Sequence, residues 1–294
     1  MIVDALNCVI RQITFLEGQN VSSCTLCGVP KSKGFADGEF SSAMFNEPIG
    51  LALMDNNDFA FVCDKDNHRI RMLSFIHRKV LTIAGTGLRG HLDGVAIHSL
   101  WNLPFAIATN KPQNKLYISD CSNFVIRELD ITTLKLANNS FADLEQAIEK
   151  FLVKTICGKP RVTGCSDGIG DIALFGSPQG LAFSNLSENI LFVCDSDNNC
   201  IKKLDIMTSQ VTTIAGMTFE QGFADGNSHE AKFHWPRGLC PDECDNLYVC
   251  DRGNHAIRKI NRAGEVVTIV RNTERQGLDT LSSNPAITLR NALH

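Results

Sequence analysis

The chain has 294 residues, with a hydrophobic content of 44% and a charged content of 20%, both ordinary for a globular protein. Its net charge of −4 creates no global basic field that would attract nucleic acid or anionic lipid. No apolar run approaches the roughly 18 residues that a membrane helix needs. The first residues also lack the basic region and long apolar stretch of a signal peptide. We therefore expect a soluble, cytoplasmic protein that has no membrane partner.

One phrase recurs five times along the chain. Each copy has an apolar run that ends at Asp, an Asn three residues later, and a second run in which Ile precedes Arg or Lys. Two short apolar runs joined by Asp and Asn turn residues predict a β-hairpin. The copies are MIVDALNCVIRQI (1–13), FVCDKDNHRIRML (61–73), YISDCSNFVIREL (117–129), FVCDSDNNCIKKL (192–204) and YVCDRGNHAIRKI (248–260).

Two further strands accompany each complete hairpin. An Asp-Gly turn and a Pro-containing phrase such as PIGLAL precede the hairpin, and a strand such as LTIAG follows it. The hairpin Asp recurs at positions 4, 64, 120, 195 and 251, so the spacings are 60, 56, 75 and 56 residues by subtraction. Four short strands repeated at this period predict an all-β protein, a β-propeller of four-stranded blades. One such sheet cannot cover both of its apolar faces, and stacking the sheets radially buries them.

The two ends of the chain complement each other. Residues 1–4 begin at the second strand of a blade, whereas residues 285–289 read as a first strand with no blade after it. Pairing the two ends would give five blades, the last of them a composite N/C-terminal closing blade, and would remove two exposed sheet edges. The alternative is six blades, which requires additional sequence. We predict a single propeller over residues 1–294.

A helical insertion is predicted at about 134–154, in the longest repeat. Ser140 and Asp143 suit the start of a helix, and an apolar stripe follows on one helical face. Its members are Leu144, Ala147, Ile148, Phe151 and Leu152. The stripe either packs on the propeller or forms a docking helix for a partner.

Two slots of the hairpin carry charge in every blade. A catalytic or metal-binding ring of aspartates and a phosphate-binding ring of basic residues are conceivable. A device repeated in every blade is more simply architectural, with Asp accepting backbone N–H bonds in the turn and the basic side chain meeting a nearby carboxylate or carbonyl. These structural positions are Asp4, Asp64, Asp120, Asp195 and Asp251, and Arg11, Arg71, Arg127, Lys202 and Arg258.

The phrases D-x-x-N-H-x-I-R and P-x-G-L-A resemble NHL repeats over roughly residues 1–270. The resemblance implies a propeller, although NHL propellers usually have six blades. Some NHL-like propellers are amidating lyases with metal-bound His at the central channel, and others bind RNA on a strongly basic top face with exposed aromatics. Here His68 and His255 share one slot, but the other blades hold Cys8, Phe124 and Asn199 there. We therefore predict no metal site and no cofactor.

The predicted binding surface is the top face, formed by the hairpin turns. Its candidate residues are His68, Arg69, Phe124, Asn199, Arg252 and His255. We expect the connections between blades to place acidic side chains on the same face, so that it leans acidic and disfavours RNA. The residues expected there are Asp37, Glu39, Asp93, Asp167, Asp171, Asp225 and Glu230.

The sequence contains no H-E-x-x-H metal-binding motif and no G-x-x-x-x-G-K-[ST] phosphate-binding loop. We predict a monomeric, non-catalytic scaffold that binds a protein partner through loops on the propeller face. One alternative is a metal-dependent lyase or lactonase-like hydrolase at the central channel. A second alternative is RNA binding.

Overall fold

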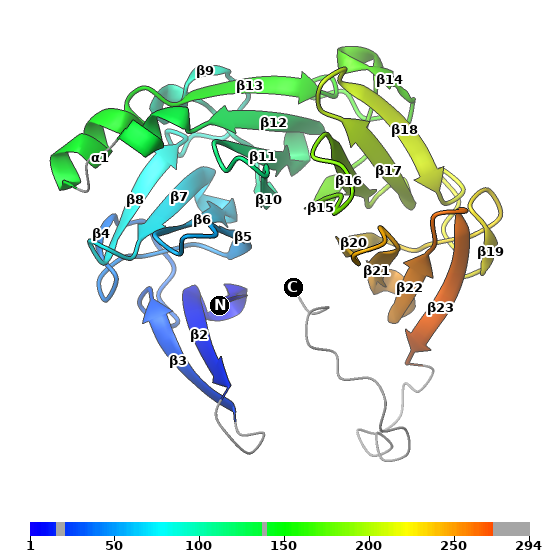
Figure 1. The fold of residues 1–294 in the computed structure, drawn as a ribbon, viewed down its shortest axis with the longest axis horizontal. Coiled ribbons are helices and arrows are strands. Elements are labelled where there is room, and N and C mark those ends of the chain that lie inside the picture. Colours follow the sequence, from blue (N-terminus) through cyan, green and yellow to red (C-terminus); the bar gives the residue numbers. More distant parts are fainter. Residues whose placement is uncertain (16–20, 137–139, 273–294) are drawn as a thin grey trace.

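The structure is a computed structural model that describes residues 1–15, 21–136 and 140–272. These residues form five antiparallel sheets, which Figure 1 shows around a common axis. Strands β5 (Pro48–Leu53), β10 (Pro104–Thr109), β15 (Pro178–Phe183) and β20 (Pro236–Pro241) are innermost. The first sheet contains β1 (Ile2–Asp4), β2 (Val9–Phe15) and β3 (Val21–Cys27). The five-bladed all-β architecture predicted from the sequence is confirmed.

Each of the other four sheets has four long strands and a two-residue strand on its outer edge. The second sheet contains β5 (Pro48–Leu53), β6 (Phe59–Asp64), β7 (Arg69–Ser74), β8 (Lys79–Ala84) and the edge strand β4 (Gly38–Glu39). The third contains β10 (Pro104–Thr109), β11 (Lys115–Asp120), β12 (Val125–Asp130), β13 (Leu152–Cys157) and β9 (Gly94–Val95). The fourth contains β15 (Pro178–Phe183), β16 (Ile190–Asp195), β17 (Cys200–Asp205), β18 (Gln210–Ala215) and β14 (Gly168–Ile169). The fifth contains β20 (Pro236–Pro241), β21 (Leu247–Asp251), β22 (Ala256–Ile260), β23 (Glu265–Arg271) and β19 (Gly226–Asn227).

The edge strands give the Asp-Gly turns a second role that the sequence did not predict. Gly38 pairs with Val80 and Glu39 pairs with Lys79, at the start of the outermost long strand. The connection between blades therefore runs along the outer edge before it returns to the axis. The closing strand predicted for residues 285–289 lies outside the described residues, and β1 pairs with β2 in the three-stranded first sheet.

The hairpin turns define the top face of the propeller. Four of the five are short 3-10 turns: Ala5–Asn7, Lys65–Asn67, Cys121–Asn123 and Arg252–Asn254. The opposite, bottom face carries the turns that join the second strand of each long hairpin to the outermost strand. Helix α1 (Phe141–Ile148) belongs to one of these bottom connections, between β12 and β13.

The apolar stripe of α1 is buried against the bottom of the propeller. The Ser140 hydroxyl caps the helix by accepting the Asp143 N–H at 3.1 Å. Leu144, Ala147 and Ile148 join the same apolar cluster as Met54 of the second blade. Leu152 was predicted on the stripe, but it begins β13 and is exposed because the helix ends at Ile148. The docking role that the stripe suggested would need a surface that the propeller already covers.

A buried ion triad holds together each of three blades. In the second blade, Arg71 donates through Nη1 to Asp64 at 2.6 Å and through Nη2 to Asp37 at 2.6 Å, and the Arg71 and Asp64 side chains are fully buried. The same triad joins Asp120, Arg127 and Asp93, and again Asp251, Arg258 and Asp225. The guanidinium can serve both carboxylates because its planar fork presents several donors.

The hairpin aspartates also tie the innermost strand to the rest of the blade. Asp64 accepts the backbone N–H of Asn46, just before β5, at 2.8 Å. Asn67 donates to Asp64 at 2.8 Å and to the Gly34 carbonyl at 2.7 Å. The sequence pattern predicted that Asp64 and Asn67 bond to the backbone of their own turn. Their partners Asn46 and Gly34 instead belong to the connection that precedes the blade. The aspartate thus joins three separate segments of one sheet.

The fourth blade has a reduced version of this arrangement because lysine replaces arginine. Lys202 pairs with Asp167 at 2.8 Å and donates to the Cys165 carbonyl. Among the described residues, Asp195 has no cation within ion-pair distance and is held by Gly176, Ser177 and Asn198. In the first blade, Asp4 accepts from Asn7, while Arg11 donates to the Ser23 and Thr25 hydroxyls.

We expect Asp195→Asn to change how stability depends on pH. Burial raises the pKa of Asp195 to about 6, although its hydrogen bonds and Lys202 act to lower it. Between about pH 6 and the ordinary value of about 3.9, the folded chain holds a proton that the unfolded chain has lost. Acidification from pH 7 to pH 4 should therefore stabilise the natural chain by roughly 2–3 kcal/mol relative to Asp195→Asn. Urea unfolding at several pH values measures this difference.

Asp167→Asn, in the same blade, should change the pH dependence of stability in the opposite direction, because the pKa of Asp167 is lowered. Burial acts to raise the pKa of Asp167, but hydrogen bonds from Lys202 and Thr213 outweigh burial and lower it. Stability contributed by this carboxylate is present above its unfolded pKa and is lost as pH falls through the folded value. Parallel pH profiles for the natural chain and Asp195→Asn would contradict the assignment of a raised pKa to Asp195.

Candidate functional site

The candidate residues His68, Phe124, Asn199 and His255, with Cys8, occupy one left-handed backbone slot. Their φ angles lie between 51° and 62°, each directly after the hairpin turn. His and Asn are among the residues enriched at positive φ, so backbone geometry explains part of their recurrence. Among the described residues, no group of three His, Cys, Asp or Glu side chains could hold a metal ion.

Two of these side chains fasten one blade to the next. His68 Nδ1 accepts the backbone N–H of Leu103 in the third blade at 3.2 Å. In the same way, Asn199 Oδ1 accepts the backbone N–H of Trp235 in the fifth blade at 3.0 Å. Burial lowers the pKa of His68, which suits a neutral ring that accepts a hydrogen bond. His68 and Asn199 therefore have structural partners on neighbouring blades.

The remaining candidates differ in what surrounds them. Arg69 donates to the Thr86 and Asn67 carbonyls and lies 3.8 Å from the centroid of the Phe35 ring. Phe124 is partly buried. Arg252 and His255 are exposed and line the main cavity of the propeller. Of the six predicted binding residues, only Arg252 and His255 line this cavity.

The expected acidic character of the top face is wrong. Asp37, Asp93, Asp167 and Asp225 pair with the buried cations of the blades. Glu39 lies on the edge strand β4 and pairs with Lys79 near the bottom. Asp171 and Glu230 follow the equivalent edge strands β14 and β19, which pair with the starts of β18 and β23. The connections descend the outer edge, and this path removes these seven acidic residues from the top, where Asp66 and Asp197 remain in the hairpin turns.

Basic residues take their place on the top face. The connections between blades meet the hairpin turns there, since the backbone N–H of Lys31 bonds to the Asn7 carbonyl and that of Arg161 bonds to the Asn123 carbonyl. The exposed basic side chains of these connections are Lys31, Lys33, Arg89, Lys159 and Arg161. Exposed apolar side chains lie among them: Phe35, Leu88, Phe219 and Trp235. We call this set the top rim.

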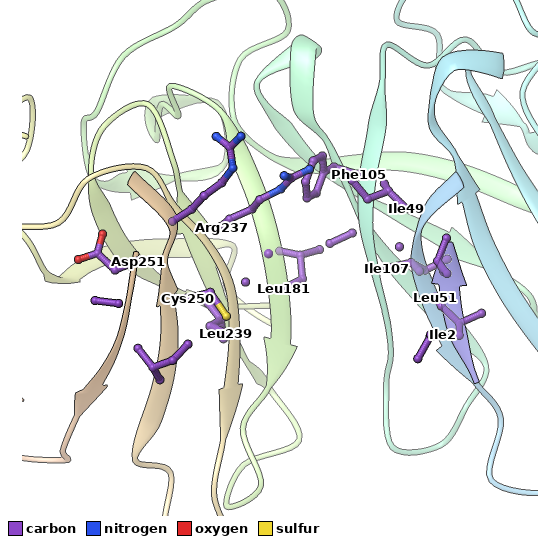
Figure 2. A pocket seen from close by; sticks show the side chains of 18 of the residues that line it. Ile2, Ile49, Leu51, Phe105, Ile107, Leu181, Arg237, Leu239, Cys250 and Asp251 are labelled. Atoms are coloured by element: carbon purple, nitrogen blue, oxygen red, sulfur yellow. The ribbon is translucent and has the colours of Figure 1, made fainter. Parts of the chain in front are cut away.

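The main cavity opens along the central axis. It has a volume of about 710 Å³, which is within the usual range for small-molecule sites. Its walls come from the innermost strands, and Figure 2 shows Ile49, Leu51, Ile107, Leu181 and Leu239 around the space. Strand β1 of the first blade and strands β21, β22 and β23 of the fifth blade also contribute lining residues. Asp251 also lines the cavity, but it is paired with Arg258.

Two arginines give the cavity a cationic end. Arg237, on β20, extends towards Phe105 on β10, and the guanidinium carbon lies 4.9 Å from the ring centroid (Figure 2). Burial lowers the pKa of Arg237, and the nearby charge of Arg252 lowers it further. Within the part of the chain that the structure describes, neither guanidinium has a hydrogen-bond or ion-pair partner.

Arg237 was not among the residues predicted from the sequence. The Pro-containing phrases place it in one slot with Ile49, Phe105 and Gln179, directly after the proline. Arg237 is the only charged residue of these four. Variation within a slot between otherwise similar repeats is therefore the signal that could have identified it.

Five antiparallel sheets around one axis, with the innermost strands lining a channel, define a β-propeller. A model of the NHL repeat family matches residues 45–72, which cover β5, β6 and part of β7. This match, together with the NHL repeat-containing relatives, supports the predicted resemblance to the NHL-repeat β-propeller family.

Two curated relatives are similar over most of this chain. Protein SUPPRESSOR OF QUENCHING 1, chloroplastic, of Arabidopsis thaliana is 30% identical over 284 residues, which cover 80% of this chain and 27% of that protein. Human NHL repeat-containing protein 2 is 27% identical over 306 residues, which cover 81% of this chain and 42% of that protein. The chain thus spans less than half the length of these relatives.

Solved structures with a similar arrangement have lower sequence identity to this chain than these relatives. An auxiliary nutrient binding protein from Bacteroides thetaiotaomicron is 13% identical with a TM-score of 0.47, covering 90% of this chain and 71% of that chain. A virginiamycin B lyase from Staphylococcus aureus is 10% identical with a TM-score of 0.45, covering 77% and 56%. No helix in the described residues is long and apolar enough to cross a membrane.

Proposed function

We propose that the protein is a binding scaffold whose top rim recognises an acidic surface of a protein partner. The observation that supports this proposal is the combination of exposed basic and apolar side chains on one face. Phe219 is 69% exposed and Trp235 is 45% exposed, although both are large apolar side chains. Aromatic residues and arginines are enriched at protein interfaces.

The charge of the rim favours an acidic partner. Lys31, Arg89 and Arg161 come from three successive connections between blades, so the charge extends over several blades. Such a surface increases the rate of association with an oppositely charged partner. A rigid ring holds these residues in place, so that binding costs little ordering of the backbone.

The test uses a glutamate-rich peptide that contains one tryptophan. Charge reversal at Lys31, Arg89 and Arg161 should weaken its binding at least tenfold, as measured by fluorescence anisotropy. The matched control reverses two exposed basic residues of the bottom connections, Lys150 and Arg262. Equal weakening by both sets of substitutions would contradict recognition by the rim.

RNA binding is the second candidate, because the top rim combines exposed basic side chains with exposed aromatic side chains. Single-stranded RNA is held by such a combination through phosphate contacts and base stacking. Filter binding of a single-stranded oligonucleotide at moderate salt distinguishes the candidates. Oligonucleotide binding that resists an excess of the glutamate-rich peptide and depends on Phe219 and Trp235 would favour RNA over an acidic protein.

A further inference from the structure

We propose that the central cavity binds an organic carboxylate whose apolar body lies between the innermost strands. None of the residues that line this site belongs to the top rim, so the inference goes beyond the proposed protein-binding function. The cavity has apolar walls along its length and two arginines at one end. A ligand that matches both features needs an anionic group joined to an apolar body.

The cationic end of the cavity is suited to a carboxylate. Arg237 is half-buried and has no partner of opposite charge among the described residues. A guanidinium presents parallel N–H donors that match the two oxygens of a carboxylate. Arg252 lines the same cavity, which brings a second cation to this end. The carboxylate of Glu47, the acidic group that acts on Arg237, is instead bonded to Lys65 at 3.0 Å.

The position of Phe105 keeps Arg237 directed across the channel. The guanidinium lies over the ring of Phe105, two blades away from β20. A cation stacked on an aromatic face is stabilised while its N–H groups remain free to bind in the ring plane of the guanidinium. Arg237 can therefore hold an anion at the end of the cavity without first breaking a bond to the protein.

The walls determine what the rest of the ligand must be. Ile49, Leu51, Ile107, Leu181 and Leu239 offer apolar surface from four different blades. A ligand with polar groups along its length would lose hydrogen bonds to water there without replacing them. The cavity volume of about 710 Å³ accepts an organic acid of about ten carbons or an apolar chain terminus.

The test uses decanoate as the probe and isothermal titration calorimetry of the full chain. We expect one saturable site, at least tenfold weaker binding to Arg237→Gln, and little binding of decanol, which lacks the charge. Arg89→Gln is the matched control, since Arg89 is an exposed cation on the top face outside the cavity. If Arg237→Gln does not fold, Arg252→Gln tests the same cationic end and should also weaken binding.

A second arm identifies the source of the carboxylate. A short peptide that ends in Leu-Leu is titrated with a free C-terminus and with an amidated one. Tighter binding of the free peptide than of decanoate assigns the site to a chain terminus, whereas the reverse order assigns it to a free organic acid. The proposal is overturned if no probe saturates, if decanol binds as well as decanoate, or if Arg89→Gln weakens binding as much as Arg237→Gln. These outcomes do not depend on the top rim, so they leave the protein-binding proposal to its own test.

Discussion

Replacing Arg127 with lysine should lower the free energy of unfolding by about 2–3 kcal/mol. Arg127 is fully buried, bridges Asp120 and Asp93, and also donates to the Leu100 and Leu92 carbonyls. A lysine ammonium cannot span both carboxylates, so one buried charge would lose its partner. Urea unfolding followed by circular dichroism measures the change.

The reverse substitution at the equivalent slot is the matched control. Lys202 pairs with Asp167, and Asp195 has no ion-pair partner among the described residues. Lys202→Arg should complete the triad of the fourth blade and raise the free energy of unfolding by about 1 kcal/mol. If both substitutions change stability in the same direction, the bridging role of the guanidinium is wrong.

Gly180→Ala should destabilise the propeller by about 2–3 kcal/mol, because the innermost strands of neighbouring blades touch at this residue. A Cβ atom on Gly180 would lie 2.5 Å from the Arg237 carbonyl oxygen and 2.9 Å from the Gly238 Cα. Backbone atoms in a paired strand cannot move aside as a flexible side chain can. The substitution should lower the melting temperature and displace Arg237, and calorimetry of decanoate binding reports that displacement.

The third blade carries the natural control for this effect. Ala106 occupies the slot of Gly180 in β10, so a Cβ is already accommodated there. Ala106→Gly should change stability by less than about 1 kcal/mol. Equal destabilisation by Gly180→Ala and Ala106→Gly would show that the close approach at Gly180 does not limit packing.

The fold could be predicted from the sequence because its repeat is local. Each blade contains its own strands, turns and buried charges within roughly 60 residues, so the pattern of one blade predicts the next. The helix at Phe141–Ile148 was also visible from its cap and apolar stripe, whereas its end before Leu152 depended on where β13 begins.

The site was less accessible to sequence reasoning for a physical reason. Which face a side chain occupies depends on the path of the connection between blades, and that path is set by pairing of Gly38 and Glu39 with β8. From the sequence pattern alone, we predicted that these residues form a turn on the top face. Arg237 was missed because its importance arises from a partner on another blade, Phe105, which lies 132 positions earlier in the chain by subtraction.

The ion triads have a consequence for how such a protein can change over generations. Arg71, Asp64 and Asp37 all belong to one sheet and its own preceding connection, so no triad needs a charge from the next blade. A duplicated or exchanged blade would therefore contain all the charged side chains of its own buried ion triad. Gene segments that encode single blades could therefore be recombined as units. Further substitutions would be needed only where adjacent blades meet, at glycines such as Gly180 and at side chains such as His68 and Asn199 that bond to the next blade.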